Sequence, residues 1–333
     1  MKKSLLYKLS LLFLIYLSAC QQQETRQTAA QWNETELVFQ SENQYNNPYT
    51  DVEFWVEFTH ESGKKLVRPG FWDGSNNWKV RFANPFDTGE WKWQSFASDR
   101  ADAGLHGKEG TMISEPYTGS NELIKNGLLV MSPGKRNVVH ASGKSFLMVG
   151  DTPWALPWRG TVESVTEYAK NRQQRGFNTA LLMSLQPDRD AEGPRNRKEA
   201  GGFGVAFEDL KDGHINQLVP EYFNLFDSLR NILIDHGIVP VYQPVFHGFG
   251  WKGQNVLGWN VDPVEYARYC RYLVARYGAK PAMWLVGADS DGRNKGIKEG
   301  GEEFEKWDAY AQPTGLHYSP FDDKIPEWMN NAD

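Results

Sequence analysis

The hydrophobic pattern of the chain changes once, near Asn121, and this change constrains the fold more than any other feature. Before it, apolar and polar residues alternate along short segments, among them 51–58, 78–82 and 90–96. Clusters of turn-forming residues separate these segments. Short alternating strands at such a spacing are typical of a β-sandwich, and we expect one of the immunoglobulin-like kind over residues 32–118.

After Asn121, apolar runs and amphipathic helical patterns follow one another in turn. The runs predict strands at 146–150, 177–185, 238–246, 282–287 and 315–319. The helical patterns lie at 161–175, 220–236, 263–277 and 302–310. Strands that alternate with helices predict a parallel sheet. The first strand is not followed by the Gly-x-Gly-x-x-Gly of dinucleotide-binding folds, so a (β/α) barrel fits the pattern better.

The length of this second region sets an expectation about the barrel. A complete (β/α)8 barrel, or TIM barrel, takes about 250 residues. The region from 119 to 333 is shorter and shows about five strands. We therefore expect a multidomain chain whose TIM barrel is incomplete at the C-terminus.

Polar side chains close four of the predicted strands. Asp151 follows the first strand, Gln186 and Asp188 the second and His247 the third, and Asp289 ends the fourth. The C-terminal ends of barrel strands share one face, where the active sites of this architecture lie, so we expect these side chains to be close together. Gln186 and His247 could each be structural, but four polar strand ends together favour a site.

Tryptophan is unusually frequent, with 13 copies. An indole face can stack on a sugar ring, although strand alternation assigns most tryptophans of the sandwich to its core. We expect Trp154 and Trp251, in the loops after the first and third strands, to line a sugar-binding cleft with His247. Trp284 is assigned to the same cleft, with burial in the core as the alternative because it lies in mid-strand.

The N-terminus has the features of a bacterial export signal. Lysines precede a hydrophobic stretch at 11–17, which is too short to span a bilayer. The stretch closes on LSAC at 17–20, which resembles a lipobox. We expect residues 1–20 to be a lipoprotein signal peptide, Cys20 to carry the lipid and the polar residues 21–31 to be a tether. The alternative is an ordinary cleaved signal with an incidental cysteine.

Several motifs resemble a known family of bacterial enzymes. The segments GFWDG (70–74), WKVRF (78–82) and TGEW (88–91) are similar to the small sandwich that precedes many glycoside hydrolases. From NG at 126 onward, GDTPW (150–154) and RGFN (175–178) resemble the apiosidase-like catalytic barrel. The resemblance extends from about residue 32 to the last residue.

This resemblance implies a two-carboxylate glycosidase. The family motif Gly-Gly-Asp-Arg corresponds to GADS at 287–290, which matches at Asp289 and differs on both sides of it. Asp289 is thereby implied as the catalytic acid/base, and Asp151 as a sugar-binding residue. The partner carboxylate of such barrels comes from a seventh strand, so the resemblance implies that it lies beyond residue 333 and that the chain alone is inactive.

These observations lead to one expected function and two alternatives. We expect a surface-anchored glycoside hydrolase of a Gram-negative bacterium, held at the outer membrane and acting on a plant or algal polysaccharide without a cofactor. One alternative is a non-catalytic carbohydrate-binding lipoprotein. The other is metal-dependent hydrolysis at 289–292, which begins like a calcium loop but has Arg293 and Gly300 where an EF-hand needs oxygen ligands. The net charge of −6 argues against nucleic acid as a partner.

Overall fold

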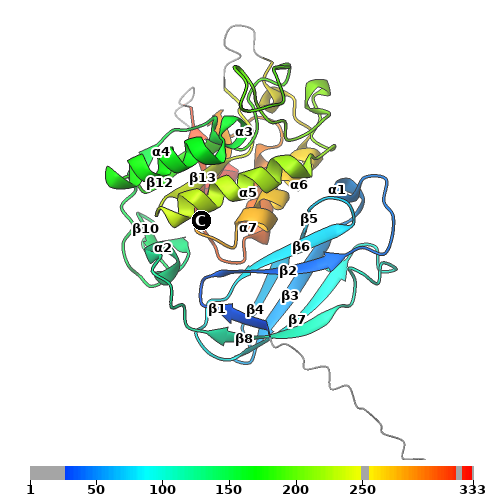
Figure 1. Cartoon of the computed structure of the whole chain (residues 1–333), viewed down its shortest axis with the longest axis vertical. Helices are drawn as coiled ribbons and strands as arrows, with labels where there is room; N and C mark the ends of the chain where they lie inside the picture. Colours follow the sequence, from blue (N-terminus) through cyan, green and yellow to red (C-terminus); the bar gives the residue numbers. More distant parts are fainter. Residues whose placement is uncertain (1–26, 249–254, 320–324, 332–333) are drawn as a thin grey trace, which may run out of the picture.

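The computed structural model describes residues 27–248, 255–319 and 325–331, which form a β-sandwich followed by an α/β domain. The two domains lie against each other, with the sandwich below the helices and the parallel sheet in the view of Figure 1. Cys20 and Trp251 lie outside the described residues. No helix in the described ranges is long and apolar enough to cross a membrane.

The sandwich consists of a five-stranded and a three-stranded sheet. The larger sheet has the order β1 (Gln27–Ala30), β8 (Glu109–Glu115), β7 (Glu90–Ala97), β3 (Phe54–His60) and β4 (Lys65–Pro69). The smaller sheet has the order β2 (Glu34–Gln40), β6 (Asn77–Ala83) and β5 (Phe71–Trp72). Every second residue of β3, beginning with Phe54, is buried, as the alternation predicted. Trp78 and Trp91 are buried in this core, so their indoles stabilise the sandwich.

Two local predictions for this domain were wrong. Residues 27–30 are not part of a tether, because they form β1, which pairs in parallel with β8. Residues 48–51 form a short helix, α1 (Pro48–Asp51), where a strand was expected to begin. Pro48 at the first helical position favours this turn, because proline fixes φ at a helical value and needs no hydrogen-bond acceptor there.

A short connection leads from the sandwich to the α/β domain. It contains helix α2 (Glu122–Lys125) and a hairpin of β9 (Leu129–Met131) and β10 (Val138–His140). Neither the helix nor the hairpin was predicted. Asn121 caps α2, because its side chain accepts a hydrogen bond from the backbone of Leu123 at 3.0 Å.

The second domain is built on a five-stranded parallel sheet. Its order follows the chain: β11 (Gly150–Asp151), β12 (Thr179–Met183), β13 (Val239–Gln243), β14 (Met283–Ser290) and β15 (Thr314–Tyr318). The helices between them are α3 (Leu156–Arg159), α4 (Val162–Gln174), α5 (Pro220–Asp235), α6 (Pro263–Tyr277) and α7 (Ile297–Trp307). Single 3₁₀ turns lie at Leu210–Asp212, Leu257–Trp259 and Glu327–Asn331. Because sequential strands are neighbours, the order is the one expected for part of a (β/α) barrel.

Local capping signals account for where these helices begin. The Thr161 side chain accepts from the backbone of Ser164 in a capping box at the start of α4. The Asp262 carboxylate accepts from the backbone of Val264 and Glu265 at the start of α6. Helix α7 begins five residues before the predicted position of 302, at Ile297.

The predicted strand at 146–150 is largely absent. Only Gly150 and Asp151 pair with β12, and Leu147 is 80% exposed. The apolar run had been interpreted as a buried strand. The run instead directly precedes β11 in the chain. β11 is an edge strand of the described sheet, with β12 as its single neighbour.

A buried network of charged side chains joins the two domains. Arg81 of the sandwich contacts Asp227 of α5 at 2.6 Å, and Arg276 of α6 contacts the same carboxylate at 2.9 Å. Burial alone would raise the pKa of Asp227, but the two guanidinium groups outweigh it and hold that pKa well below its ordinary value. The Arg230 guanidinium also binds Glu34 at 2.9 Å. These contacts fix the sandwich on the helical face of the α/β domain.

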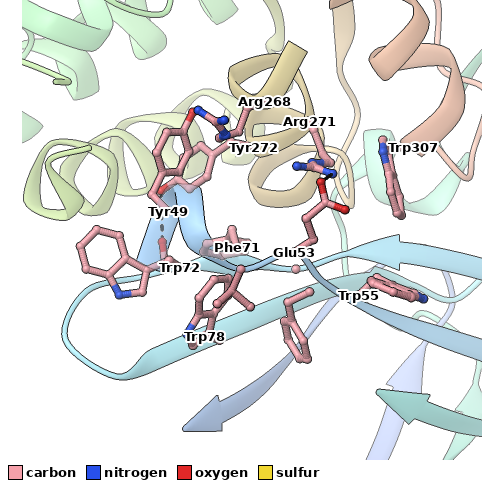
Figure 2. Close-up of a pocket in the computed structure, with 13 residues that line it drawn as sticks. Tyr49, Glu53, Trp55, Phe71, Trp72, Trp78, Arg268, Arg271, Tyr272 and Trp307 are labelled. Carbon is pink, nitrogen blue, oxygen red and sulfur yellow. Dashed lines mark hydrogen bonds and ion pairs between the residues drawn. The ribbon is translucent and has the colours of Figure 1, made fainter. Parts of the chain in front are cut away.

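A small hollow lies next to this network, between the domains. Figure 2 shows the ion pair between Glu53 and Arg271, with Trp55 and Trp307 both to the right of it in this view. The two groups of that pair are 2.7 Å apart. None of the polar side chains that close the strands of the parallel sheet lines this hollow. It therefore belongs to the domain contact and is separate from the site described next.

Candidate active site

Asp289 lies at the C-terminal end of β14 and is the centre of the candidate site. Its backbone has φ of +52°, a left-handed conformation that is uncommon outside glycine. The carboxylate is partly exposed, and its Oδ1 lies 3.4 Å from Nδ1 of His317 on the neighbouring strand β15. Asp289 therefore presents a carboxyl group at the strand ends with one oxygen against an imidazole.

His317 has two further neighbours from other strands. Nε2 of Gln243, the last residue of β13, lies 2.9 Å from the same Nδ1 atom. The Trp154 ring meets the imidazole edge to face at 6.2 Å between centroids. Trp154 also contacts the ring of Phe246 at 5.4 Å. Four segments of the sheet thus bring side chains to one end of it.

His247 follows β13 and is buried at the same end. Its Nδ1 donates to the carbonyl oxygen of Val245 at 3.0 Å, so Nε2 carries the lone pair of the neutral ring. Burial lowers the pKa of His247 to about 4, although the bond to Val245 acts in the opposite direction. His247 is therefore a neutral side chain at physiological pH and can accept a hydrogen bond.

Several buried polar atoms at these strand ends have no hydrogen-bond partner among the described residues. Native proteins satisfy most buried polar groups, so a cluster of exceptions calls for an explanation. A hydroxyl-rich ligand can supply the missing donors and acceptors. The atoms are Nε1 of Trp154, Oγ of Ser184, Oε1 of Gln186, Oε1 of Gln243 and Nε2 of His247.

The structure places Asp151 differently from the sequence-based prediction. Its side chain forms an ion pair with Arg172 of α4, so it is directed to that helix and not to Asp289. Partial burial disfavours its charged form, but Arg172 and the backbone of Thr152 outweigh this and lower the pKa of Asp151. The strand end was predicted correctly, whereas the expected cluster with Asp289 was not.

Trp284 is not available to a ligand, so its assignment to the cleft was wrong. It is fully buried in the core of the α/β domain. The ring stacks between Tyr242 and Phe304, at centroid distances of 5.1 and 5.2 Å. The alternative of core burial, which its mid-strand position suggested, is the correct one.

The calcium-loop reading of residues 289–292 has no support in the described contacts. The Asp291 carboxylate accepts from the backbone and the guanidinium of Arg293, at 2.9 and 3.0 Å. The Ser290 hydroxyl donates to Asn294 at 2.6 Å. No group of three or more potential metal-ligating side chains occurs in the described ranges.

Sequence reasoning missed two members of the site, His317 and Gln243. Strand β15 was predicted, but its histidine was not singled out. Gln243 is the last residue of β13, whereas the polar residue predicted for this strand end was His247, four residues later. Both residues lie among the last two positions of their strands, where polar side chains can also be sought.

Comparisons with known proteins agree with this architecture. The sequence model described as "Apiosidase-like, catalytic domain" matches residues 132–333, and a domain of unknown function, DUF5060, matches residues 28–98. Among curated proteins, no sequence matches the chain.

Two solved structures from Bacteroides vulgatus are among those that match the chain. A candidate glycoside hydrolase has 18% identity and a TM-score of 0.67 over 87% of this chain and 56% of its own. A family 5 glycoside hydrolase has 21% identity and a TM-score of 0.43 over 62% of this chain and 44% of its own. The chain thus spans little more than half the length of the first structure. The likeness to this first structure shows the fold.

Proposed function

Because the chain belongs to the apiosidase-like glycoside hydrolase family, we propose that it cleaves glycosidic bonds of a plant or algal polysaccharide, with Asp289 as general acid/base. The observation that carries this proposal is the position of Asp289. It places a carboxyl group at the C-terminal end of a central strand, with one oxygen against His317 at 3.4 Å. That end of the strands is where barrel enzymes carry out chemistry.

The proposed chemistry is proton transfer to and from the substrate. In its acid form, Asp289 gives its proton to the glycosidic oxygen as the bond from that oxygen to the anomeric carbon breaks. A second carboxylate attacks that carbon or activates water. Asp151 is not assigned this role, because its carboxylate forms an ion pair with Arg172. We place the second carboxylate outside the described residues.

We propose that the unpartnered polar atoms at the strand ends bind sugar hydroxyls. Gln186 and His247 offer acceptor atoms, and Trp154 offers an indole N–H. Sugar binding by a few placed polar groups and an aromatic ring is the usual form of a ligand site. Trp251, in the loop after β13, remains a proposed member of this cleft.

Replacement of Asp289 by Asn tests the catalytic role. Asparagine has the same shape and tolerates the left-handed backbone, so the fold and ligand affinity should be retained. Turnover of the natural glycan should fall on the order of 100- to 10,000-fold. The loss should be smaller for an aryl glycoside whose leaving group needs no protonation. Full activity of Asp289→Asn on the natural glycan would reject the role.

Asp291→Asn is the matched control. It removes a carboxylate two residues away that is bound to Arg293, so it should leave turnover nearly unchanged. Equal losses in both variants would point to damage of the loop after β14.

A second candidate function is carbohydrate binding without catalysis. The cluster of unpartnered polar atoms favours it as much as it favours hydrolysis, because those atoms bind and do not react. Calorimetry with oligosaccharides, together with a hydrolysis assay, separates the two. Binding without turnover in the full-length natural protein would favour this second function.

We further propose that Cys20 is lipidated and anchors the protein at the surface of a Gram-negative bacterium. The support is the motif LSAC at 17–20 after a short hydrophobic stretch. A surface location suits an enzyme whose polymeric substrate cannot enter the cell.

A further inference from the structure

His317 is in contact with two groups through a single atom. Its Nδ1 lies 2.9 Å from Nε2 of Gln243 and 3.4 Å from Oδ1 of Asp289. A neutral imidazole has one nitrogen that donates and one that accepts, so Nδ1 can take only one role at a time. The two neighbours must therefore be compatible with the same role.

The arrangement in the structure corresponds to one of two consistent states. An amide nitrogen can only donate, so Gln243 Nε2 requires a lone pair on Nδ1. Asp289 fits next to that lone pair when Oδ1 carries the proton. After Asp289 has given its proton away, both of its oxygens are acceptors, and Nδ1 must then donate.

Gln243 is suited to follow this change. Its amide carries a donor on one side and an acceptor on the other, so rotation by half a turn presents Oε1 to Nδ1–H. Oε1 has no hydrogen-bond partner among the described residues, so the rotation breaks no further contact. The side chain is buried, and solvent therefore does not fix its orientation.

From this geometry, and on the premise that Asp289 is the acid/base, we propose that His317 is the positioning residue of Asp289 and that the Gln243 amide rotates as Asp289 changes between its acid and base forms. The contact with His317 holds the carboxyl group of Asp289 in position at the strand ends. In the acid step the proton of Asp289 moves to the glycosidic oxygen. The partly exposed His317 ring then changes tautomer through solvent, because Nδ1 takes a proton from water and Nε2 releases one to it. In the base step Asp289 takes a proton from the water whose oxygen bonds to the anomeric carbon, while Nδ1 gives its proton back to solvent and Nε2 regains one.

The other charged groups near the pair do not replace this function. His247, after β13, is neutral because burial lowers its pKa to about 4. Asp151, at β11, is paired with Arg172, and Asp291, after β14, with Arg293. Trp154 contributes a ring contact to His317 and no charge.

Kinetics of His317→Phe and Gln243→Leu in the full-length enzyme test the positioning role. His317→Phe should lower kcat on the natural glycan about 100-fold with little change in KM, because a displaced catalytic group costs that much. The loss should shrink for an activated aryl glycoside, and the pH profile of kcat should change. His317→Gln, which can contact Asp289, should recover part of the rate.

Gln243→Glu separates this proposal from a merely structural one. A carboxylate at 243 can only accept, so it should favour the tautomer with the proton on Nδ1. Long-range ¹H–¹⁵N spectra of the histidine rings report the tautomer without any turnover, and His317→Gln identifies the signals. We expect the proton of the neutral His317 ring on Nε2 in the wild type and on Nδ1 in Gln243→Glu.

Two results would overturn the proposal. One is the same His317 tautomer in the wild type and in Gln243→Glu. The other is a rate loss in His317→Phe that is equal for all leaving groups and appears in KM. The control His214→Gln removes a different histidine–carboxylate contact, at 2.9 Å from Glu265, and should keep the wild-type rate. If Asp289→Asn is fully active, the catalytic proposal fails, while the tautomer measurement still decides whether Gln243 and His317 are coupled.

Discussion

The indole nitrogen of Trp284 donates a hydrogen bond to Oδ2 of Asp308 at 3.0 Å, inside the core of the α/β domain. Burial raises the pKa of Asp308 although Arg68 and this bond act in the opposite direction. The pair links the N-terminal end of β14 to the C-cap residue of α7. It makes Trp284 a structural residue.

Trp284→Phe should therefore destabilise the fold without changing ligand affinity. The variant leaves a cavity and removes one partner of a buried carboxylate, which together should cost about 3 kcal/mol. Urea unfolding and oligosaccharide calorimetry measure the two effects. Trp72→Phe, at a half-buried indole that donates to Ser75, is the control and should cost clearly less. Loss of ligand affinity with unchanged stability would contradict this assignment.

Stability should fall as the pH drops from about 6.5 to about 4 because of His247. Its folded-state pKa is about 4, whereas an unfolded histidine has a pKa of about 6.5. Over this interval the unfolded chain binds a proton that the folded protein does not. The contribution of His247 to the free energy of unfolding is therefore fully present above pH 6.5 and is lost on acidification. The loss should reach about 3 kcal/mol.

His247→Asn tests this pH dependence, because an amide can still donate to Val245 but does not titrate. Denaturant unfolding from pH 8 to 4 should show parallel curves above pH 7 and a smaller acid slope in the variant. Identical slopes would show that His247 is accessible to protons in the folded state.

Asp227→Asn should weaken the contact between the domains. It leaves the guanidinium groups of Arg81 and Arg276 without their shared carboxylate, which should cost about 3 to 5 kcal/mol at pH 7. The folded-state pKa of Asp227 is below its ordinary value of about 4. The stabilisation is thus present above pH 4 and is lost as the pH falls toward the folded-state pKa.

The difference between wild type and Asp227→Asn should accordingly narrow below pH 4. Chemical denaturation at pH 7 and pH 3 measures it. The exposed Asp235→Asn, on the same helix, should change stability by less than about 1 kcal/mol. A difference in the free energy of unfolding between wild type and Asp227→Asn that is the same at pH 7 and pH 3 would contradict this dependence on the pKa of Asp227.

Cys20→Ser should release the protein from membranes. A lipoprotein carries several acyl chains, and more than one chain is needed for stable anchoring. Fractionation of cells that express each form, followed by immunoblotting, measures the distribution. Unchanged membrane association of Cys20→Ser would reject the anchor.

The sequence was most informative where structure depends on near neighbours. Strands β12 and β13 lie within the predicted segments, and β14 begins within its segment and extends past residue 287 to Ser290. These strands were found because long apolar runs flanked by glycine indicate buried strands. Helix α6 begins at the predicted residue and helix α4 one residue after it, because Asp262 and Thr161 cap them. Asp289 was found because a rule for strand ends needs no long-range information.

The errors arose where burial or side-chain direction depends on distant segments. Leu147 is apolar but exposed, and the apolar run alone could not show this. Asp151 turns to Arg172, a residue 21 positions later, and the strand-end rule does not give a side-chain direction. The contact of Gln243 with His317 joins residues 74 positions apart, a separation at which sequence pattern carries no signal.

The left-handed backbone at Asp289 has an evolutionary consequence. A residue other than glycine pays a conformational cost there of order 1 to 3 kcal/mol. Replacement by glycine would relieve that cost and abolish the proposed acid, so random mutation at this codon can raise thermal stability while it destroys activity. Retention of aspartate at 289 in a natural population would therefore be a sign of selection on turnover, because folding alone favours its loss.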